Sequence, residues 1–265
     1  MHGRFFDELR ERYRRLVSEH AIDVLCLQEN EPHLGGPITV EANKRGTQAE
    51  AMCHALGGFQ CVCNKEYPAL ATLVGSELSV QESFLIRLPR LPRLTWFERL
   101  YIRGGKANQK FAQATRVQKS GISFTIVNFH LDTAGDNTHR RSQIQAIADE
   151  LLSRKLVRSI SACGDTNAFT WSRAAGMLVV SDVMAPLRQA VGATIKSSNQ
   201  ATHYFARQRE DLLTHRFLTL VGKLGLDHPL PYDVICSDWA VLRQGKVMIQ
   251  ESDHDLVFAE LSVSA

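Results

Sequence analysis

The stretch Ser161-Ala162-Cys163-Gly164-Asp165-Thr166-Asn167 indicates the fold class, because a short apolar run ends there in polar residues. The run from Ser159 to Cys163 predicts a buried strand with Asp165 and Asn167 at its carboxyl end. In open α/β sheets, ligands bind at that end. If the chain stays extended to Asn167, both side chains would project into one site. The alternative is a strand-to-loop turn in which these side chains cap the backbone.

Composition places the chain among globular proteins. Of its 265 residues, 44% are hydrophobic and 22% are charged, which is ordinary for a folded domain. No repeat or long linker divides the sequence, so we expect a single domain over residues 1–265. No apolar run approaches the roughly 20 residues of a membrane-spanning helix, and the charged N-terminal segment lacks the core of a signal peptide. We therefore expect a soluble, cytoplasmic protein without a transmembrane segment, monomeric by default.

Hydrophobic periodicity predicts strands with intervening helices. The expected helices cover 6–17, 48–56, 138–152, 172–190 and 212–224. The expected strands cover 21–27, 70–74, 84–88, 111–117, 122–129, 159–163, 233–236, 239–243, 246–250 and 255–263. Of these, 239–243 and 246–250 are expected to form a hairpin over Gln244-Gly245. The order favours a layered α/β sandwich.

The six cysteines do not suggest a disulfide framework. Cys26, Cys163 and Cys236 lie inside apolar, strand-like runs, where a free thiol behaves as a small buried hydrophobe. The other three include no CxxC pair of the kind found in zinc sites. We expect all six to be reduced.

The segment 87–119 is basic, although the net charge of the whole chain is only +3. Glu98 is its only acidic residue, and four aromatic residues are interleaved with its cations. Its basic residues are Arg87, Arg90, Arg93, Arg99, Arg103, Lys106, Lys110, Arg116 and Lys119. Such a stretch can bind phosphates and stack bases or sugars. It can equally be a solvated edge whose aromatic rings belong to the core.

Seven polar residues share one position in the pattern, the edge of a strong apolar run, where a sheet presents side chains at its rim. They are Glu29, His130, Asp165, Asn167, Asp233, Asp253 and His254. Each has a simple structural explanation by itself, such as a solvated strand end or a turn acid. Their joint occurrence favours one functional site.

Together these residues supply the parts of a metal-assisted phosphate hydrolysis. Carboxylates such as Glu29 and Asp253 suit Mg²⁺ or Mn²⁺ better than zinc, and the ion would neutralise phosphate charge. Asp165 would position and deprotonate the attacking water, while Asn167 would hold that geometry.

The remaining three residues suit the phosphoryl oxygens. His254, oriented by Asp233, would donate hydrogen bonds to these oxygens as charge builds up, and His130 would contact a second oxygen.

The order of these motifs resembles the endonuclease/exonuclease/phosphatase (DNase I-like) superfamily over most of the chain, roughly 5–263. The motifs are Leu27-Gln28-Glu29, Asn128-Phe129-His130-Leu131, Gly164-Asp165-Thr166-Asn167, Tyr232-Asp233-Val234-Ile235 and Ser252-Asp253-His254. The resemblance implies a four-layered α/β sandwich, with two packed mixed sheets flanked by helices, and a Mg²⁺-dependent phosphoesterase. It also implies that Glu29 binds metal, that Asp165 is the base, and that Asp233 pairs with His254.

The sequence departs from that family in two places. Members usually begin with a strand that ends in an Asn near the metal, whereas this sequence opens on the first helix, so we expect a sandwich without that strand or a start truncated upstream of it. Pro231 stands two residues before Asp233, where many members carry Arg.

The sequence favours a Mg²⁺-dependent hydrolase of phosphate esters, with a nuclease slightly preferred because of the basic segment 87–119. The alternatives are a lipid or inositol-phosphate phosphoesterase and a non-catalytic phosphate-binding relative. The apolar helix expected at 212–224 is compatible with a lipid, with a partner or with simple packing. Whether the substrate is DNA, RNA, inositol phosphate or phospholipid stays open.

Overall fold

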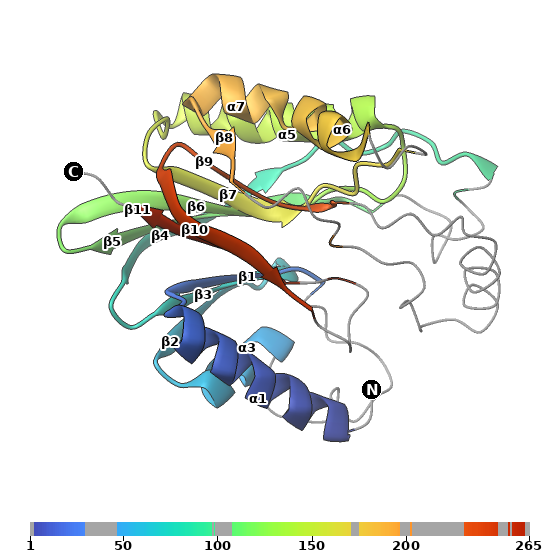
Figure 1. Cartoon of the computed structure of the whole chain (residues 1–265). Coiled ribbons are helices and arrows are strands. Elements are labelled where there is room, and N and C mark those ends of the chain that lie inside the picture. Colours follow the sequence, from blue (N-terminus) through green and yellow to red (C-terminus); the bar gives the residue numbers. More distant parts are fainter. Residues whose placement is uncertain are drawn as a thin grey trace. The chain divides into compact units, whose positions relative to one another are not determined.

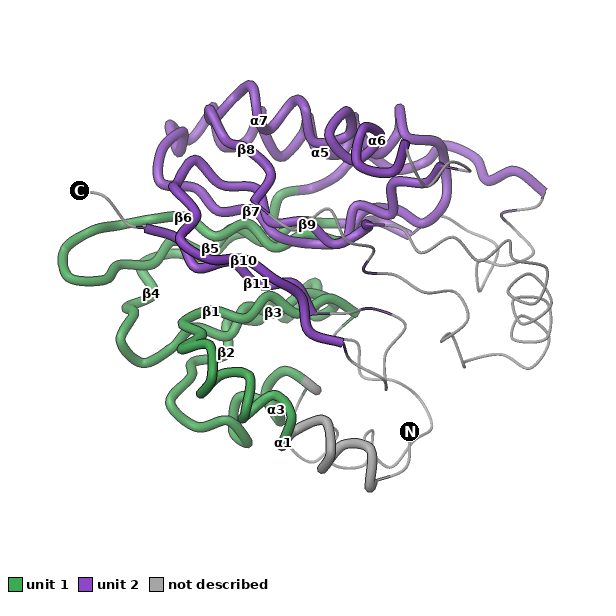
Figure 2. The backbone as a smooth tube through the Cα atoms, viewed as in Figure 1, with its two compact units in different colours: residues 1–86, 111–130 green, residues 87–110, 131–265 purple. Residues whose placement is uncertain are grey.

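The computed structural model describes residues 3–29, 47–96, 98, 108–170, 175–196, 202, 231–248, 254 and 256–262, with the side chains of 3–10 and 48 left out. The chain divides into two compact units, coloured separately in Figure 2. Unit 1 comprises 1–86 and 111–130, and unit 2 comprises 87–110 and 131–265. The single domain expected over 1–265 stays a prediction.

Unit 1 combines helices with antiparallel strands. Its helices are α1 (Gly3–His20) and α3 (Gln48–Leu56), and its strands are β1 (Val24–Leu27), β2 (Phe59–Asn64), β3 (Tyr67–Gly75), β4 (Ser79–Arg87), β5 (Phe111–Lys119) and β6 (Ile122–His130). Strands β1, β3 and β2 form one sheet in that order, and β4, β5 and β6 are neighbours in another. The pair β5 and β6 follows the predicted strands at 111–117 and 122–129.

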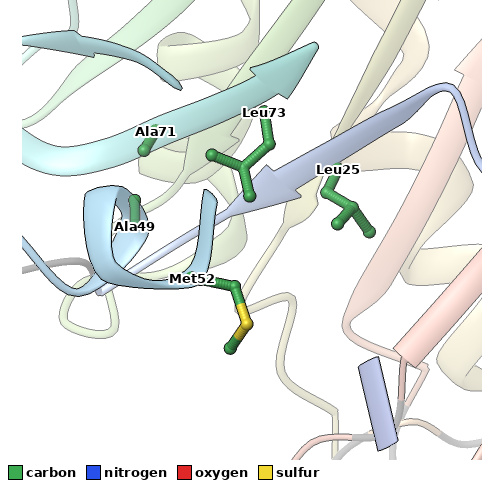
Figure 3. Close-up of a cluster of buried hydrophobic side chains, with 5 residues drawn as sticks. All are labelled: Leu25, Ala49, Met52, Ala71 and Leu73. Carbon is green, nitrogen blue, oxygen red and sulfur yellow. The ribbon is translucent and has the colours of Figure 1, made fainter. Parts of the chain in front are cut away.

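A small apolar core joins α3 to the first sheet (Figures 1 and 3). Ala49 and Met52 of α3 cluster with Leu25, Ala71 and Leu73 of strands β1 and β3. Burying this apolar surface stabilises the layer by roughly 25 cal/mol per Å². The start of α3 is further fixed by a capping box between the Thr47 and Glu50 side chains and backbones.

Buried polar side chains connect the two sheets of unit 1. Thr72 Oγ1 of β3 donates to Gln113 Oε1 of β5 over 3.0 Å, and Gln113 Nε2 donates to the Val62 carbonyl over 3.1 Å. Both side chains are almost fully buried. Because a buried polar group without a partner is costly, these bonds fix how β3 faces β5.

Unit 2 combines three helices and five strands among its described residues. The helices are α5 (Asn137–Ser153), α6 (Gly176–Val183) and α7 (Ala185–Val191), and the strands are β7 (Ile160–Asp165), β8 (Thr194–Ile195), β9 (Asp233–Ser237), β10 (Ala240–Val247) and β11 (Leu256–Ser262). Strand β9 lies between β7 and β8 and is antiparallel to both, and β10 pairs with β11. Helices α6 and α7 contact α5.

The predicted α/β sandwich is confirmed as a fold class. The hairpin expected over Gln244-Gly245 is wrong. Residues 240–247 form one continuous strand, β10, in which Gly245 is paired with Phe258 of β11. A Cβ at Gly245 would lie 2.7 Å from the Phe258 ring, so this glycine admits a neighbouring ring and makes no turn. The helix expected at 212–224 lies outside the described residues.

All six cysteines are free thiols, as expected. Burial raises the pKa of Cys61 and of Cys236 to about 12, so these two thiols are protonated at neutral pH and unreactive. In the part of the chain that the structure describes, no helix has the length and apolar character needed to cross a membrane.

Candidate active site

Asp165 and Asp233 face each other across two strands of unit 2. Asp165 is the last residue of β7 and Asp233 the first of β9, and the two are partners in the antiparallel register. Asp165 is 6% exposed. Antiparallel pairing puts the carboxyl end of one strand beside the amino end of the other, so the two motifs Gly164–Asn167 and Tyr232–Ile235 meet at one edge of the sheet.

His254 completes this cluster from a position just before β11. Its Nδ1 lies 2.8 Å from Asp233 Oδ2, and its Nε2 lies 3.8 Å from Asp165 Oδ2. The first distance is a hydrogen bond and the second is too long for one. Because an ionised carboxylate only accepts, Asp233 fixes a proton on Nδ1. The predicted pairing of Asp233 with His254 is therefore present in the geometry.

The three side chains also match a metal-binding arrangement, since one ligand atom from each of Asp165, Asp233 and His254 lies within 4.8 Å of the others. We interpret the cluster as a hydrogen-bonded acid and base system, because His254 Nδ1 is hydrogen-bonded to Asp233 Oδ2 and Nε2 faces Asp165.

The strand does not continue to Asn167, so the condition under which Asp165 and Asn167 would both project into one site is not met. Its φ is +46°, in the left-handed region, and its backbone N–H donates to Asp165 Oδ1 over 2.7 Å. Its side-chain amide donates to the Leu131 carbonyl over 3.0 Å. Asn is among the residues that adopt this conformation most readily. The capped turn is thus the conformation that the structure has, whereas the role of Asn167 in a site stays a prediction.

Three hydrogen bonds to backbone carbonyls hold the Asp165 turn in place. The Leu131 N–H donates to the Asp165 carbonyl over 3.0 Å, and the Tyr232 carbonyl accepts from both N–H and Oγ1 of Thr166. Burial raises the pKa of Tyr232, and the nearby Asp165 charge raises it further. The Tyr232 phenol therefore stays neutral at ordinary pH.

Unit 1 brings together two other predicted residues. Glu29 follows β1 with a left-handed φ of +56°, and its exposed carboxylate lies 4.0 Å from Nε2 of the buried His130 at the end of β6. Beside them, Gln28 Nε2 donates to Asn128 Oδ1 over 2.8 Å. The motif Leu27–Glu29 and the segment Asn128–His130 therefore meet in unit 1, where Gln28 is hydrogen-bonded to Asn128. Asp253, the second predicted metal ligand, lies outside the described residues.

Asn137 and Arg140 of α5 were not identified from the sequence. Their side chains are hydrogen-bonded to backbone groups of Phe169, which follows the Asp165 turn, and of Asp132, which follows Leu131. The Asn137 side chain donates to the Phe169 carbonyl over 2.8 Å and accepts from the Phe169 N–H over 3.1 Å. Arg140 is 3% exposed and donates to the carbonyls of Asp132, Thr133 and Gly135. The only available signal was polar residues at the start of an amphipathic helix, which usually face solvent.

No protein-family model matches the sequence, and no curated protein matches it. Solved structures do match it. An endonuclease/exonuclease/phosphatase from Bacteroides vulgatus is 13% identical and covers 96% of this chain and 90% of its own, with a TM-score of 0.62. TDP2 of D. rerio, in complex with a single-strand DNA product, is 12% identical and covers 96% of this chain and 91% of its own, with a TM-score of 0.60.

A third solved structure is similar to the same extent. The mannosyl-6-phosphatase Bt3783 of Bacteroides thetaiotaomicron is 12% identical and covers 97% of this chain and 92% of its own, with a TM-score of 0.59. At such low identity the likeness establishes the fold. The chain therefore has the same α/β sandwich fold as these structures, the fold class that its sequence predicted.

Proposed function

We propose that the chain is a divalent-metal-dependent phosphoesterase that hydrolyses a phosphate ester by in-line attack of water. The observation that carries the proposal is the cluster of Asp165, Asp233 and His254 at the edge of the β7–β9 sheet, with its Nδ1 to carboxylate bond of 2.8 Å. A buried carboxylate next to an oriented imidazole is the arrangement required to move a proton from water and to stabilise charge on a phosphoryl oxygen. Structures with this fold include a phosphatase and a protein bound to a DNA product.

Asp165 acts as the base in this proposal. Its side chain is held by the N–H of Asn167 through Oδ1, and Oδ2 is the carboxylate oxygen nearest to His254. An Asp fixed in this way can take the proton of the attacking water, and Asn167 keeps the turn in position without competing for that proton. His254 donates to a phosphoryl oxygen, with its ring orientation set by Asp233. We propose that His130 contacts a second phosphoryl oxygen.

We propose that Glu29 and Asp253 bind the metal, with Mg²⁺ preferred and Mn²⁺ acceptable. The donor chemistry fits, because the Glu29 carboxylate is solvent-accessible and hard carboxylate oxygens are the protein ligands that Mg²⁺ prefers. When bound, the ion would supply charge neutralisation for the phosphate and the leaving oxygen.

Among phosphate esters, a nucleic acid is the preferred substrate. Arg87, Arg90, Arg93 and Arg116 of the basic segment 87–119 are all exposed, as contacts to a phosphate backbone require. Lipid and inositol phosphates remain alternative substrates, and a phosphate-binding protein without turnover is the non-enzymatic alternative.

A substrate panel tests the proposal. The full chain is assayed with Mg²⁺, with Mn²⁺ and with EDTA on single-stranded and duplex DNA, RNA, inositol phosphates, sphingomyelin and bis-p-nitrophenyl phosphate. We expect metal-dependent hydrolysis that Asp165→Asn reduces at least about 100-fold. Asp149→Asn, on the exposed face of α5, is the matched control and should retain activity.

Three results decide between the candidate functions. Hydrolysis that survives Asp165→Asn would exclude the assigned base. No hydrolysis of any substrate with either metal, combined with measurable phosphate binding, would favour the non-catalytic relative. Hydrolysis confined to inositol phosphates or sphingomyelin would overturn the nucleic-acid preference.

A further inference from the structure

Trp96 is an aromatic side chain that the fold leaves accessible. It exposes 65% of its surface, and it is the one aromatic among the exposed large hydrophobic side chains of the described residues. A flat ring held at the surface can stack on a base or a sugar.

The backbone that carries Trp96 is firmly held. Thr95 Oγ1 donates to Glu98 Oε2 over 2.7 Å and accepts from the Glu98 N–H over 3.3 Å, and the Thr95 N–H donates to the same carboxylate oxygen over 2.7 Å. These reciprocal bonds are those of a capping box. The exposed ring therefore stands on a short turn whose conformation is fixed before any ligand binds.

The same turn is attached to the loop 131–137. Glu98 Oε1 accepts from the Gly135 N–H over 2.5 Å, and Leu94 packs on Ala134 with Leu91 beside them. Gly135 has a φ of +83°, and a Cβ there would lie 3.0 Å from the Leu91 side chain. A side chain at this glycine would adopt a strained backbone conformation and would crowd the Leu91 and His139 side chains.

The loop 131–137 begins at the candidate base. The Leu131 N–H donates to the Asp165 carbonyl and the Leu131 carbonyl accepts from the Asn167 side chain, both over 3.0 Å. Because consecutive Cα atoms are about 3.8 Å apart, Gly135 lies within about 15 Å of Leu131. Glu98 is hydrogen-bonded to Gly135, and Trp96 lies two residues from Glu98 in sequence. One extended ligand can therefore reach both Trp96 and Asp165.

The charge around Trp96 favours a polyanion. Arg90 and Arg93 precede it and are exposed, whereas the carboxylate of Glu98 accepts hydrogen bonds from Thr95 and Gly135. Exposed cations close in sequence to an accessible ring match a phosphate backbone with bases. In a duplex the base faces are stacked on one another, so the ring requires unpaired bases.

We propose that Trp96 is a stacking site for one base of a single-stranded nucleic acid, with Arg90 and Arg93 contacting its phosphates. This inference rests on the proposed function, because it assigns the substrate class of the same site. It adds a residue outside the acid and base cluster and predicts a preference for single strands over duplexes.

Binding is measured by fluorescence anisotropy with the full chain in EDTA, so that no turnover is required. The ligands are a labelled oligothymidylate of about 12 nucleotides, a base-free strand of the same length and a duplex. We expect Trp96→Ala to raise the Kd for oligothymidylate about 5- to 30-fold and to leave the Kd for the base-free strand unchanged. Trp96→Phe should stay within about threefold of wild type. Leu178→Ala, which removes another exposed apolar side chain, should have no effect.

The salt dependence separates stacking from charge. Arg93→Gln should reduce the slope of log K against log salt by about 0.7, whereas Arg158→Gln, an exposed arginine after α5, should leave it unchanged. The inference is overturned if Trp96→Ala binds oligothymidylate within about twofold of wild type, if it weakens the base-free strand equally, or if the wild type binds the duplex as tightly as the single strand.

The two proposals fail separately. Asp165-dependent hydrolysis with Trp96-independent binding would remove the stacking site and keep the phosphoesterase. Trp96-dependent binding without hydrolysis of any substrate would remove the phosphoesterase and keep a single-strand binding surface.

Discussion

The imidazole of His254 is hydrogen-bonded to the carboxylate of Asp233, with Nδ1 2.8 Å from Oδ2. The two residues are 21 positions apart in sequence, and Asp233 is in turn the strand partner of Asp165. This hydrogen bond gives the imidazole of His254 one orientation and one tautomer.

Replacing Asp233 with Asn should lower kcat at least about 100-fold. The amide keeps the size of the side chain but, by offering an N–H in place of a carboxylate oxygen, no longer holds the proton on Nδ1. Steady-state kinetics on the substrate identified by the panel measures the loss, and circular dichroism checks the fold. An Asp233→Asn enzyme within tenfold of wild type would show that His254 needs no such orientation.

Replacing Glu29 with Gln should weaken Mg²⁺ binding at least about tenfold, because a neutral amide is a poorer ligand for a hard cation. Isothermal titration of the full chain with Mg²⁺ gives the Kd directly and without turnover. Glu82→Gln, an exposed glutamate on β4, is the control. Equal Mg²⁺ affinity of the Glu29→Gln variant and the wild type would remove Glu29 from the metal site.

Asn128→Ala should lower the free energy of unfolding by about 2–3 kcal/mol. The side-chain amide donates to the buried carbonyls of Leu27 and Ala71 and accepts from Gln28, so truncation leaves these groups without their partner. Urea denaturation compares the variant with Gln81→Ala, an exposed change on β4 that should cost under about 0.5 kcal/mol. Equal losses for the two variants would contradict the assigned network.

Arg140→Lys should cost about 2–3 kcal/mol of stability, although the charge is kept. A lysine lacks the planar fork of donors that reaches three backbone carbonyls of the loop 131–137. The neighbouring change Arg141→Lys is the matched control, because Arg141 is exposed and pairs with the exposed Asp182. Surface pairs of that kind contribute about 0–1 kcal/mol. If both lysine variants unfold at the same urea concentration, the hydrogen bonds from the Arg140 guanidinium to the three carbonyls do not contribute measurably to stability.

The ionisation of Glu98 should make the free energy of unfolding depend on pH. Burial alone would raise the pKa of this carboxyl, but hydrogen bonds from Thr95 and Gly135, together with the nearby charge of Arg140, lower the pKa below its usual 4.5. Because the folded pKa lies below the unfolded one, the contribution is fully present above the unfolded pKa and is lost as the pH falls through the folded pKa.

We therefore expect Glu98→Gln to destabilise the protein at pH 7, and only modestly because this carboxyl is screened by solvent. The two proteins should converge as the pH falls below about 4. Urea denaturation at a series of pH values measures the difference. A difference that is constant from pH 7 to pH 3.5 would mean that ionisation of Glu98 does not matter.

The sequence was sufficient for the fold class and for which strand ends carry polar residues. The apolar runs at 111–117, 122–129 and 159–163 predicted β5, β6 and β7 because alternation and β-branched content are local properties. The motif at Gly164–Asn167 left two conformations open, an extended chain and a capped turn, and the structure has the capped turn. The predicted hairpin at Gln244-Gly245 was wrong because the glycine is required by the Phe258 ring on the paired strand β11, which the local sequence does not reveal.

Tertiary structure decided which of those polar residues meet. The antiparallel register that places Asp165 opposite Asp233, and the return of His254 to both, depend on pairing between segments far apart in sequence. The left-handed turn at Asn167 and the Arg140 fork under the loop 131–137 depend on the same kind of contact. Local patterns determine where a strand ends and what it carries, whereas distance in space is fixed only when the buried surfaces of all strands and helices are packed together.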